Sequence, residues 1–151
     1  MRRLLRIALL TLCLLPTAVR AAGPDDSARA VMSLLEQASA QRLEADYSFA
    51  LVRGGTPVLC SGHAVVQTPM FRISGNGVEI YCDGVSLRYL DPQAREEYIE
   101  PAVGLEDYLK ENIADIRDFK ASNIVITPRS DSRSMFEAPQ TGSDWVVTDL
   151  R

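Results

Sequence analysis

Residues 72–90 read RISGNGVEIYCDGVSLRYL and contain two tight-turn signals, Asn76-Gly77 and Asp83-Gly84. A two-residue hairpin turn needs positive φ at its central positions, which Asn, Asp and Gly tolerate best. Short apolar runs flank these turns at 71–74, 78–82 and 85–90. The stretch therefore predicts three consecutive antiparallel strands, a meander with one face free to line a core or a ligand site.

The alternation of apolar and polar positions continues on both sides of this meander. Tyr47, Phe49 and Leu51 share one phase of a first strand, and residues 58–67 and 97–100 are also predicted strands. Shorter strands are expected at 123–127, 135–138 and 145–149. No repeat or long linker divides the chain, so residues 22–151 are expected to form a single domain.

Two segments follow the 3.6-residue period of an amphipathic helix instead. The first covers 27–43, and its apolar stripe consists of Val31, Leu34, Leu35 and Ala38. The second covers 104–119, and its stripe consists of Leu105, Leu109, Ile113 and Ile116. This order of a helix, about five strands, a helix and further strands is typical of an α+β fold, in which helices pack on one face of an antiparallel sheet.

Residues 1–21 are expected to be a cleaved signal peptide. Three arginines at positions 2, 3 and 6 precede an apolar run over 7–15 that Pro16 ends. Val19 and Ala21 have the spacing of a signal-peptidase site, and the run is far shorter than the roughly 20 residues of a transmembrane helix. We therefore expect an exported protein that begins at Ala22 or Gly23.

Cleavage would make the chain strongly acidic. The full chain has 16 basic and 20 acidic residues, and the first 21 residues hold four arginines and no acid. The remainder has a net charge of −8, which gives no electrostatic reason to bind nucleic acid or anionic head groups. About 130 residues make one domain with a modest core, and we expect a monomer.

Cys60 and Cys82 remain after cleavage, and the sequence leaves open whether they form a disulfide. An exported protein keeps disulfides, which favours the bridge. In a simple meander, however, one strand separates the two cysteines, and two strand spacings of about 4.8 Å exceed the roughly 7 Å limit between bridged Cα atoms. The alternative is two buried thiols that pack as small apolar groups.

The sequence gives little support for an enzyme. The single histidine, His63, falls on the polar phase of its strand and is interpreted as solvent-facing. Glu96, Glu97 and Glu100 are interpreted as a solvated face. No Cys/His spacing suits zinc and no loop matches an EF-hand or a P-loop, so we expect neither a metal nor a cofactor. Whether the apolar face of the sheet holds a filled core or a groove stays open at this point.

An ordered set of motifs runs along the chain. The motifs are the first strand with Tyr47 and Phe49, Ser61-Gly62, the turn TPMFRI, the run EIYCDGVSLRYLDPQAREEYI, then VITPR and the closing FEAPQTGSDWVVTDLR. In this order they resemble the LolA family of periplasmic lipoprotein carriers. They cover most of residues 22–151. Only six residues separate Pro128 from Met135, so the chain is similar to a shortened member of the family.

The resemblance implies a curved antiparallel sheet that forms an incomplete, half-open barrel with helices over its concave face. It further implies a non-enzymatic periplasmic binder of lipoprotein acyl chains or other lipids, with membrane-associated Lol-type proteins as partners. A cavity would be lined by Phe49, Phe71, Ile73, Val78, Ile80, Leu87 and Tyr89, and a lid helix would present Leu105, Leu109, Ile113 and Ile116. Fold alone does not settle function, and the rival hypothesis is a protein-interaction domain with a filled apolar core.

Overall fold

The computed structural model describes residues 24–52, 54–110 and 113–151. The predicted signal peptide, residues 1–21, lies outside the described residues. The described elements are α1 (Pro24–Ala40), β1 (Arg42–Val52), β2 (Pro57–Gln67), β3 (Met70–Gly75), β4 (Val78–Cys82), β5 (Ser86–Asp91), β6 (Glu96–Pro101), α2 (Leu105–Lys110), η1 (Ile113–Asp115), β7 (Ile116–Thr127), η2 (Ser134–Phe136) and β8 (Val146–Asp149). None of the helices in these ranges is long and apolar enough to cross a membrane.

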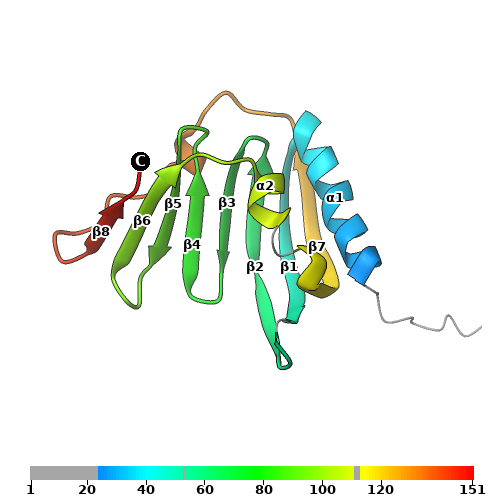
Figure 1. Cartoon of the computed structure of the whole chain (residues 1–151). Coiled ribbons are helices and arrows are strands. Elements are labelled where there is room, and N and C mark those ends of the chain that lie inside the picture. The colour runs from blue at the N-terminus through cyan, green and yellow to red at the C-terminus, as the bar shows by residue number, and fades with distance from the viewer. Residues whose placement is uncertain (1–23, 53, 111–112) are drawn as a thin grey trace, which may run out of the picture.

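The eight described strands form one sheet in the order β7-β1-β2-β3-β4-β5-β6-β8. Neighbouring strands are antiparallel except β6 and β8, which run parallel. The sheet does not close, because β7 and β8 lie at its two ends (Figure 1). The α+β class and the central meander are therefore as the sequence predicts.

The two turns of the opening stretch use different chemistry. Asn76 and Gly77 both have positive φ, 52° and 83°, as the predicted hairpin between β3 and β4 requires. At the second turn only Gly84 has positive φ. Asp83 instead accepts hydrogen bonds through Oδ1 from the backbone N–H groups of Val85 and Ser86, at 2.8 and 2.7 Å. Its side chain thus stabilises the turn that leads into β5.

The second predicted helix, 104–119, is wrong beyond its first turns. The helix α2 ends at Lys110, and residues from Ile116 onward form β7, which pairs with β1. The β1–β7 register shifts twice, and Asp118 and Asn123 have positive φ at these shifts. Each bulge adds one residue to β7 and breaks the period-two alternation that identifies a strand. Because Leu109, Ile113 and Ile116 have a helical spacing, the sequence predicted a helix that ran into this bulged strand.

Other boundaries also differ from the predictions: the helix predicted from residue 27 begins at Pro24, and the strand predicted at 123–127 is the end of β7. The first helix ends at Ala40, not at residue 43, because Leu43 already pairs with Val66 in β1 and β2. The predicted strand 135–138 is absent from the described residues, where the 3-10 helix η2 places Phe136 in a fully buried position. The final strand, β8, is present close to its predicted bounds.

The core lies between one face of the sheet and the two helices. Its buried members are Ala38, Leu43, Ala45, Val66, Phe71, Ile80, Cys82, Leu87 and Leu105. In Figure 1 both helices lie over the β7, β1, β2 and β3 part of the sheet, and β5, β6 and β8 extend beyond them. Each fully buried Leu or Phe contributes roughly 1.5–3 kcal/mol, so this one-sided layer provides most of the hydrophobic stabilisation.

The opposite face of β5 and β6 carries a buried ion pair. Arg88 contacts Glu97, whose side chain is only 1% exposed, so the interpretation of Glu97 as part of a solvated face is wrong. Thr141 donates to Glu97 Oε2 at 2.8 Å, and Arg88 also donates to the carbonyl of Ala138 at 3.2 Å. Glu97 is thus buried beneath the segment that leads to β8. This segment is distant from Glu97 in the sequence.

Candidate functional site

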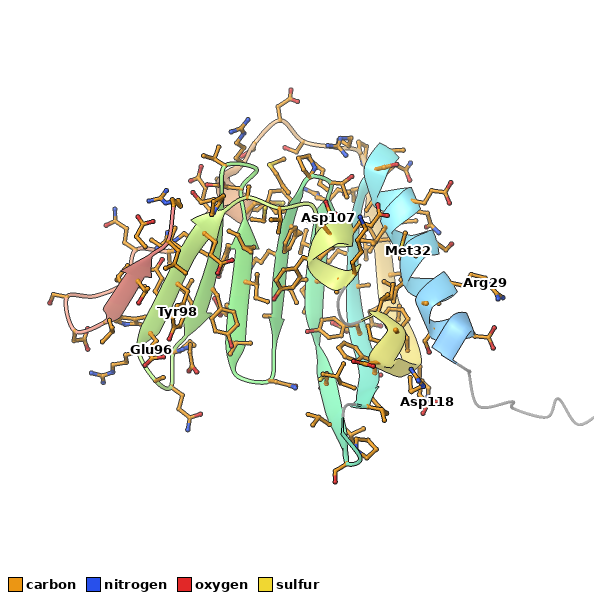
Figure 2. All side chains as sticks on the ribbon, in the orientation of Figure 1. Arg29, Met32, Glu96, Tyr98, Asp107 and Asp118 are labelled. Carbon is orange, nitrogen blue, oxygen red and sulfur yellow. The ribbon has the colours of Figure 1, made fainter. Side chains whose placement is uncertain are left out.

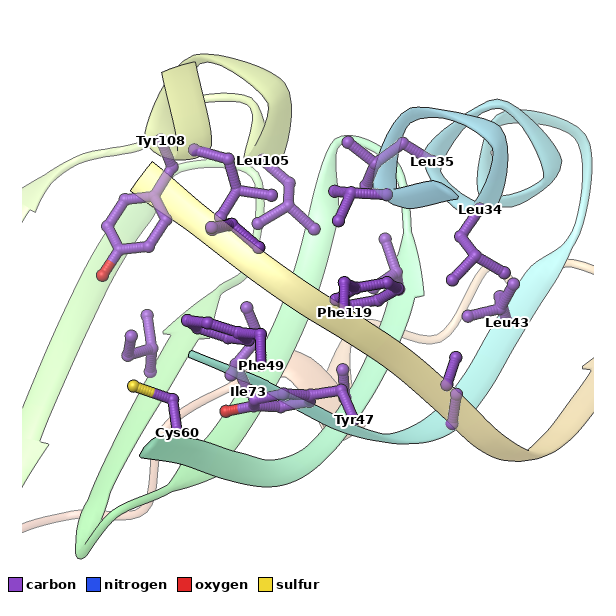
Figure 3. A pocket seen from close by; sticks show the side chains of 18 of the residues that line it. Leu34, Leu35, Leu43, Tyr47, Phe49, Cys60, Ile73, Leu105, Tyr108 and Phe119 are labelled. Atoms are coloured by element: carbon purple, nitrogen blue, oxygen red, sulfur yellow. The ribbon is translucent and has the colours of Figure 1, made fainter. Parts of the chain in front are cut away.

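A cavity of about 330 Å³ lies between the helices and the inner face of the sheet. Its wall consists of Val31, Leu34 and Leu35 from α1; Leu43, Ala45, Tyr47, Phe49 and Leu51 from β1; Cys60, Ala64 and Val66 from β2; Ile73, Ile80, Leu105, Tyr108 and Leu109; and Ile116, Phe119 and Ala121 from β7. Figure 3 shows side chains of the helices pointing towards those of the strands across this space. None of these described lining side chains carries a charge.

The strand register explains why the wall is apolar. Alternate residues of a strand point to the same face, so the five β1 residues of the wall occupy every second position from 43 to 51. Across the strands, Phe49 lies opposite Cys60, and Ala64 lies opposite Ile73. Ala45 and Ala64 are also direct partners, and such small side chains leave space that a pair of larger residues would fill.

The aromatic end of the cavity depends on a pair of glycines. Tyr47 and Phe49 stack with ring centroids 5.9 Å apart, and the Tyr47 hydroxyl donates to the Ser74 carbonyl at 3.4 Å. Gly62 and Gly75 face each other in β2 and β3. A Cβ atom on Gly75 would lie 2.6 Å from the Tyr47 hydroxyl oxygen. Gly75 therefore makes room for the tyrosine side chain, and Gly62 makes room for the backbone of β3, whose Ser74 carbonyl accepts the tyrosine hydrogen bond.

Few polar atoms reach the cavity wall. They are the hydroxyls of Tyr47 and Tyr108 and the sulfur of Cys60, which Figure 3 shows at the same end of the cavity. Burial raises the pKa of both tyrosines above the ordinary value, so both hydroxyls are neutral at physiological pH. The wall is thus suited to an apolar group and would penalise a charged one.

The cavity size limits what it can hold. Ligand sites commonly span about 300–1,000 Å³, and this cavity lies at the small end of that range. An apolar cavity of about 150 Å³ accommodates benzene, so a cavity of about twice that size accommodates a larger apolar group such as a single hydrocarbon chain.

Comparisons with protein-family models and with curated protein sequences give no match to this chain. The resemblance to the LolA family therefore stays a prediction that rests on the motifs in the sequence.

The predicted site residues separate into four groups. Phe49, Ile73, Ile80, Leu105, Leu109 and Ile116 line the cavity, although Ile116 does so from β7 and not from a helix. Leu87 and Tyr89 line a second pocket next to the cavity. Phe71 is fully buried in the core, with its ring centroid 6.0 Å from that of Tyr108. Val78 and Ile113 are half-buried and lie outside the cavity wall.

Sequence reasoning missed most of the wall contributed by α1, β2 and β7. The apolar phase that holds Cys60, Ala64 and Val66 is visible in the sequence, as is the stripe with Leu34 and Leu35. These segments face one shared space because β7 pairs with β1. The paired residues are about 70 positions apart in the chain, so no local sequence pattern predicts this pairing.

The two cysteines do not form a disulfide. Both are free, and Cys82 is fully buried whereas Cys60 is half-buried. Cys82 lies opposite Phe71, and Phe71 lies opposite Val66, six positions along β2 from Cys60. Six strand residues span about 20 Å, far beyond the roughly 7 Å that a disulfide allows.

His63 lies on the face of the sheet away from the cavity, as its strand phase predicts. Its Nδ1 is 2.8 Å from Asp46 Oδ1, and its Nε2 is 3.1 Å from Glu44 Oε1. Asn123 donates to Asp46 at 2.6 Å, and this bond, followed by that to His63, lowers the pKa of Asp46. The cluster ties β1 to both neighbouring strands. Within the described residues no group of His, Cys, Asp or Glu has the arrangement of a metal site.

Proposed function

We propose that this chain is an exported, non-enzymatic carrier that binds the apolar chain of a lipid or lipoprotein, in the manner of the LolA family. The observation that carries the proposal is the uncharged cavity of about 330 Å³ between the helices and the sheet. The ordered motifs in the sequence support the same function independently of the cavity.

The energetics of the wall favour a hydrocarbon ligand. Moving a methylene group from water into an apolar site gains about 0.8 kcal/mol, so a chain of several methylenes gains several kcal/mol before the cost of its immobilisation. The neutral hydroxyl of Tyr108 at one end can donate a hydrogen bond to a carbonyl or ester group of the ligand.

A half-open barrel with a movable cover is the finer arrangement that we propose. The open edges at β7 and β8 are compatible with a curved, incomplete barrel. Helix α2 has six residues and contributes Leu105, Tyr108 and Leu109 to the wall. Because these few side chains supply its apolar contact, α2 is the element whose displacement would admit a ligand at least cost.

The rival hypothesis, a protein-interaction domain with a filled core, fits the cavity less well. Protein interiors are packed to about 0.74 of their volume, with few voids larger than a water molecule. An apolar cavity as large as this one costs stability in a domain of this size, and a ligand-binding function explains why that cost is tolerated.

A fluorescent acyl probe tests the proposal directly. We expect residues 22–151 to bind the probe, and Leu109→Glu to weaken binding at least about tenfold, because a carboxylate at the wall resists desolvation. Val103→Glu is the matched control, since Val103 is exposed just before α2 and lies outside the wall. Binding that is equal in the two variants, or absent from the wild type, would contradict the proposal.

Export is tested separately. The protein expressed from the full chain should be recovered from the periplasm with Ala22 or Gly23 at its N-terminus. Recovery of Met1 in a membrane fraction would overturn this part of the proposal.

A further inference from the structure

A second pocket adjoins the cavity on the part of the sheet that the helices leave uncovered. It has a volume of about 350 Å³ and is lined by Ile80, Leu87, Tyr89, Tyr98, Glu100 and Tyr108. Ile80 and Tyr108 also line the first cavity, so the two spaces share a boundary. A ligand that occupied both pockets would pass the boundary that these two residues form.

Three tyrosines from three elements surround this second pocket. Tyr89 and Tyr98 are direct partners in β5 and β6, and their rings meet edge to face with centroids 6.3 Å apart. Tyr108 adds a third ring from α2. Tyr98 is 37% exposed, so the aromatic surface is accessible from solvent. Aromatic rings that converge on one space attract cations through their negative faces.

The charges around the three rings all have the same sign. Glu100 lines the pocket, and no hydrogen bond or ion pair to its carboxylate exists within the described residues. Alternation along β6 and β5 places Glu96 and Asp91 on the same face as Tyr98 and Tyr89. The Tyr98 hydroxyl donates to Glu96 at 3.0 Å, and Figure 2 shows both residues on β6, away from α1. Among the described residues that line the pocket, none is basic.

We propose that this pocket binds the cationic nitrogen, an amine or quaternary ammonium, of an amphiphile whose apolar tail occupies the first cavity. The inference rests on the proposed function, since it assigns the head group of the same ligand. The tyrosine rings supply cation–π attraction, and the Glu100 carboxylate supplies the counter-charge. An anionic head would meet the Glu100 carboxylate in the pocket, with Glu96 and Asp91 on the same face of the sheet, so the site discriminates by charge.

The test uses three amphiphiles with the same dodecyl tail and different heads: trimethylammonium, maltoside and sulfate. Each competes with the acyl probe below its micellar concentration, at physiological salt to limit long-range attraction. We expect the cationic amphiphile to bind about tenfold more tightly than the neutral one, and the anionic amphiphile to bind most weakly.

Variants assign this preference to the pocket. Tyr98→Leu and Glu100→Gln should each reduce the preference for the cation by about threefold or more while leaving maltoside binding unchanged. Tyr98→Phe keeps the ring and should keep the preference. Glu137→Gln makes the same charge change at an exposed residue outside both pockets, and it should also keep the preference.

The outcomes separate the two proposals. Equal binding of all three amphiphiles, or a preference that survives Tyr98→Leu and Glu100→Gln, overturns the head-group site and leaves the acyl cavity in place. A bound probe that none of the three amphiphiles displaces overturns the head-group site alone. Failure of the probe to bind overturns the proposed function and the head-group site with it.

Discussion

Replacing Ala64 with leucine adds three carbon atoms to the wall of the cavity. Ala64 lies on β2 opposite Ala45 and Ile73, with its side chain at the cavity surface. If the added carbons enter space that is already free, they gain up to about 0.8 kcal/mol each, or about 2 kcal/mol together. If the site is closely packed, the same substitution costs about 1–3 kcal/mol. The sign of the stability change thus separates a cavity from a filled core.

The assay combines urea unfolding with acyl-probe binding. We expect Ala64→Leu to unfold at an equal or higher urea midpoint with an unchanged m-value, and to bind the probe more weakly because its side chain competes for the space. Ala38→Leu is the matched control, since Ala38 is fully buried in the core cluster and outside the cavity wall, and it should lose about 1–3 kcal/mol. Equal destabilisation by Ala64→Leu and Ala38→Leu would show that Ala64 is as closely packed as the core and does not face a cavity.

Three further predictions concern the frame around the cavity. Arg88→Met should lower the free energy of unfolding in urea by about 3–5 kcal/mol, because it leaves the Glu97 carboxylate buried without its cation. A decrease below about 1 kcal/mol would mean that Arg88 and Glu97 behave as an exposed ion pair. Titration of residues 22–151, unfolded without reductant, should find two free thiols, and a count of zero free thiols would restore the disulfide. In the folded protein Cys82 should react far more slowly than Cys60, because Cys82 is fully buried and burial raises the pKa of its thiol. Gly62→Ala should cost about 1–3 kcal/mol and disturb Tyr47 fluorescence, because a Cβ there overlaps the Ser74 carbonyl oxygen; a stability equal to the wild type would show that β2 and β3 can separate freely.

The local chemistry of turns and strand phases was enough to predict the meander. Asn76-Gly77 specifies its own hairpin, and the apolar phase of each strand identifies which face it buries. The apolar stripe of the first helix is likewise readable from its 3.6-residue period. These features depend on neighbours within a few residues, where the sequence pattern and the structure have the same cause.

Features that depend on distant partners were not predictable in this way. Asp118 and Asn123 form bulges only because β7 pairs with β1, and without that pairing the segment resembles a continuing helix. Glu97 looks like a surface acid, but Arg88 and the segment around Thr141 bury it. The cavity wall likewise combines β1 with β7, so its extent follows from tertiary pairing and not from any single strand.

Lipid that co-purifies with residues 22–151 is the most direct test of the central claim. Protein recovered from the periplasm without detergent would be analysed by native mass spectrometry, then extracted and reanalysed as the free lipid. If the protein is a lipid carrier, the spectrum will show a bound species with one apolar chain or more per protein, which Leu109→Glu loses and Val103→Glu retains. Protein that carries no lipid and takes up no acyl probe when the probe is supplied would rule out the carrier function.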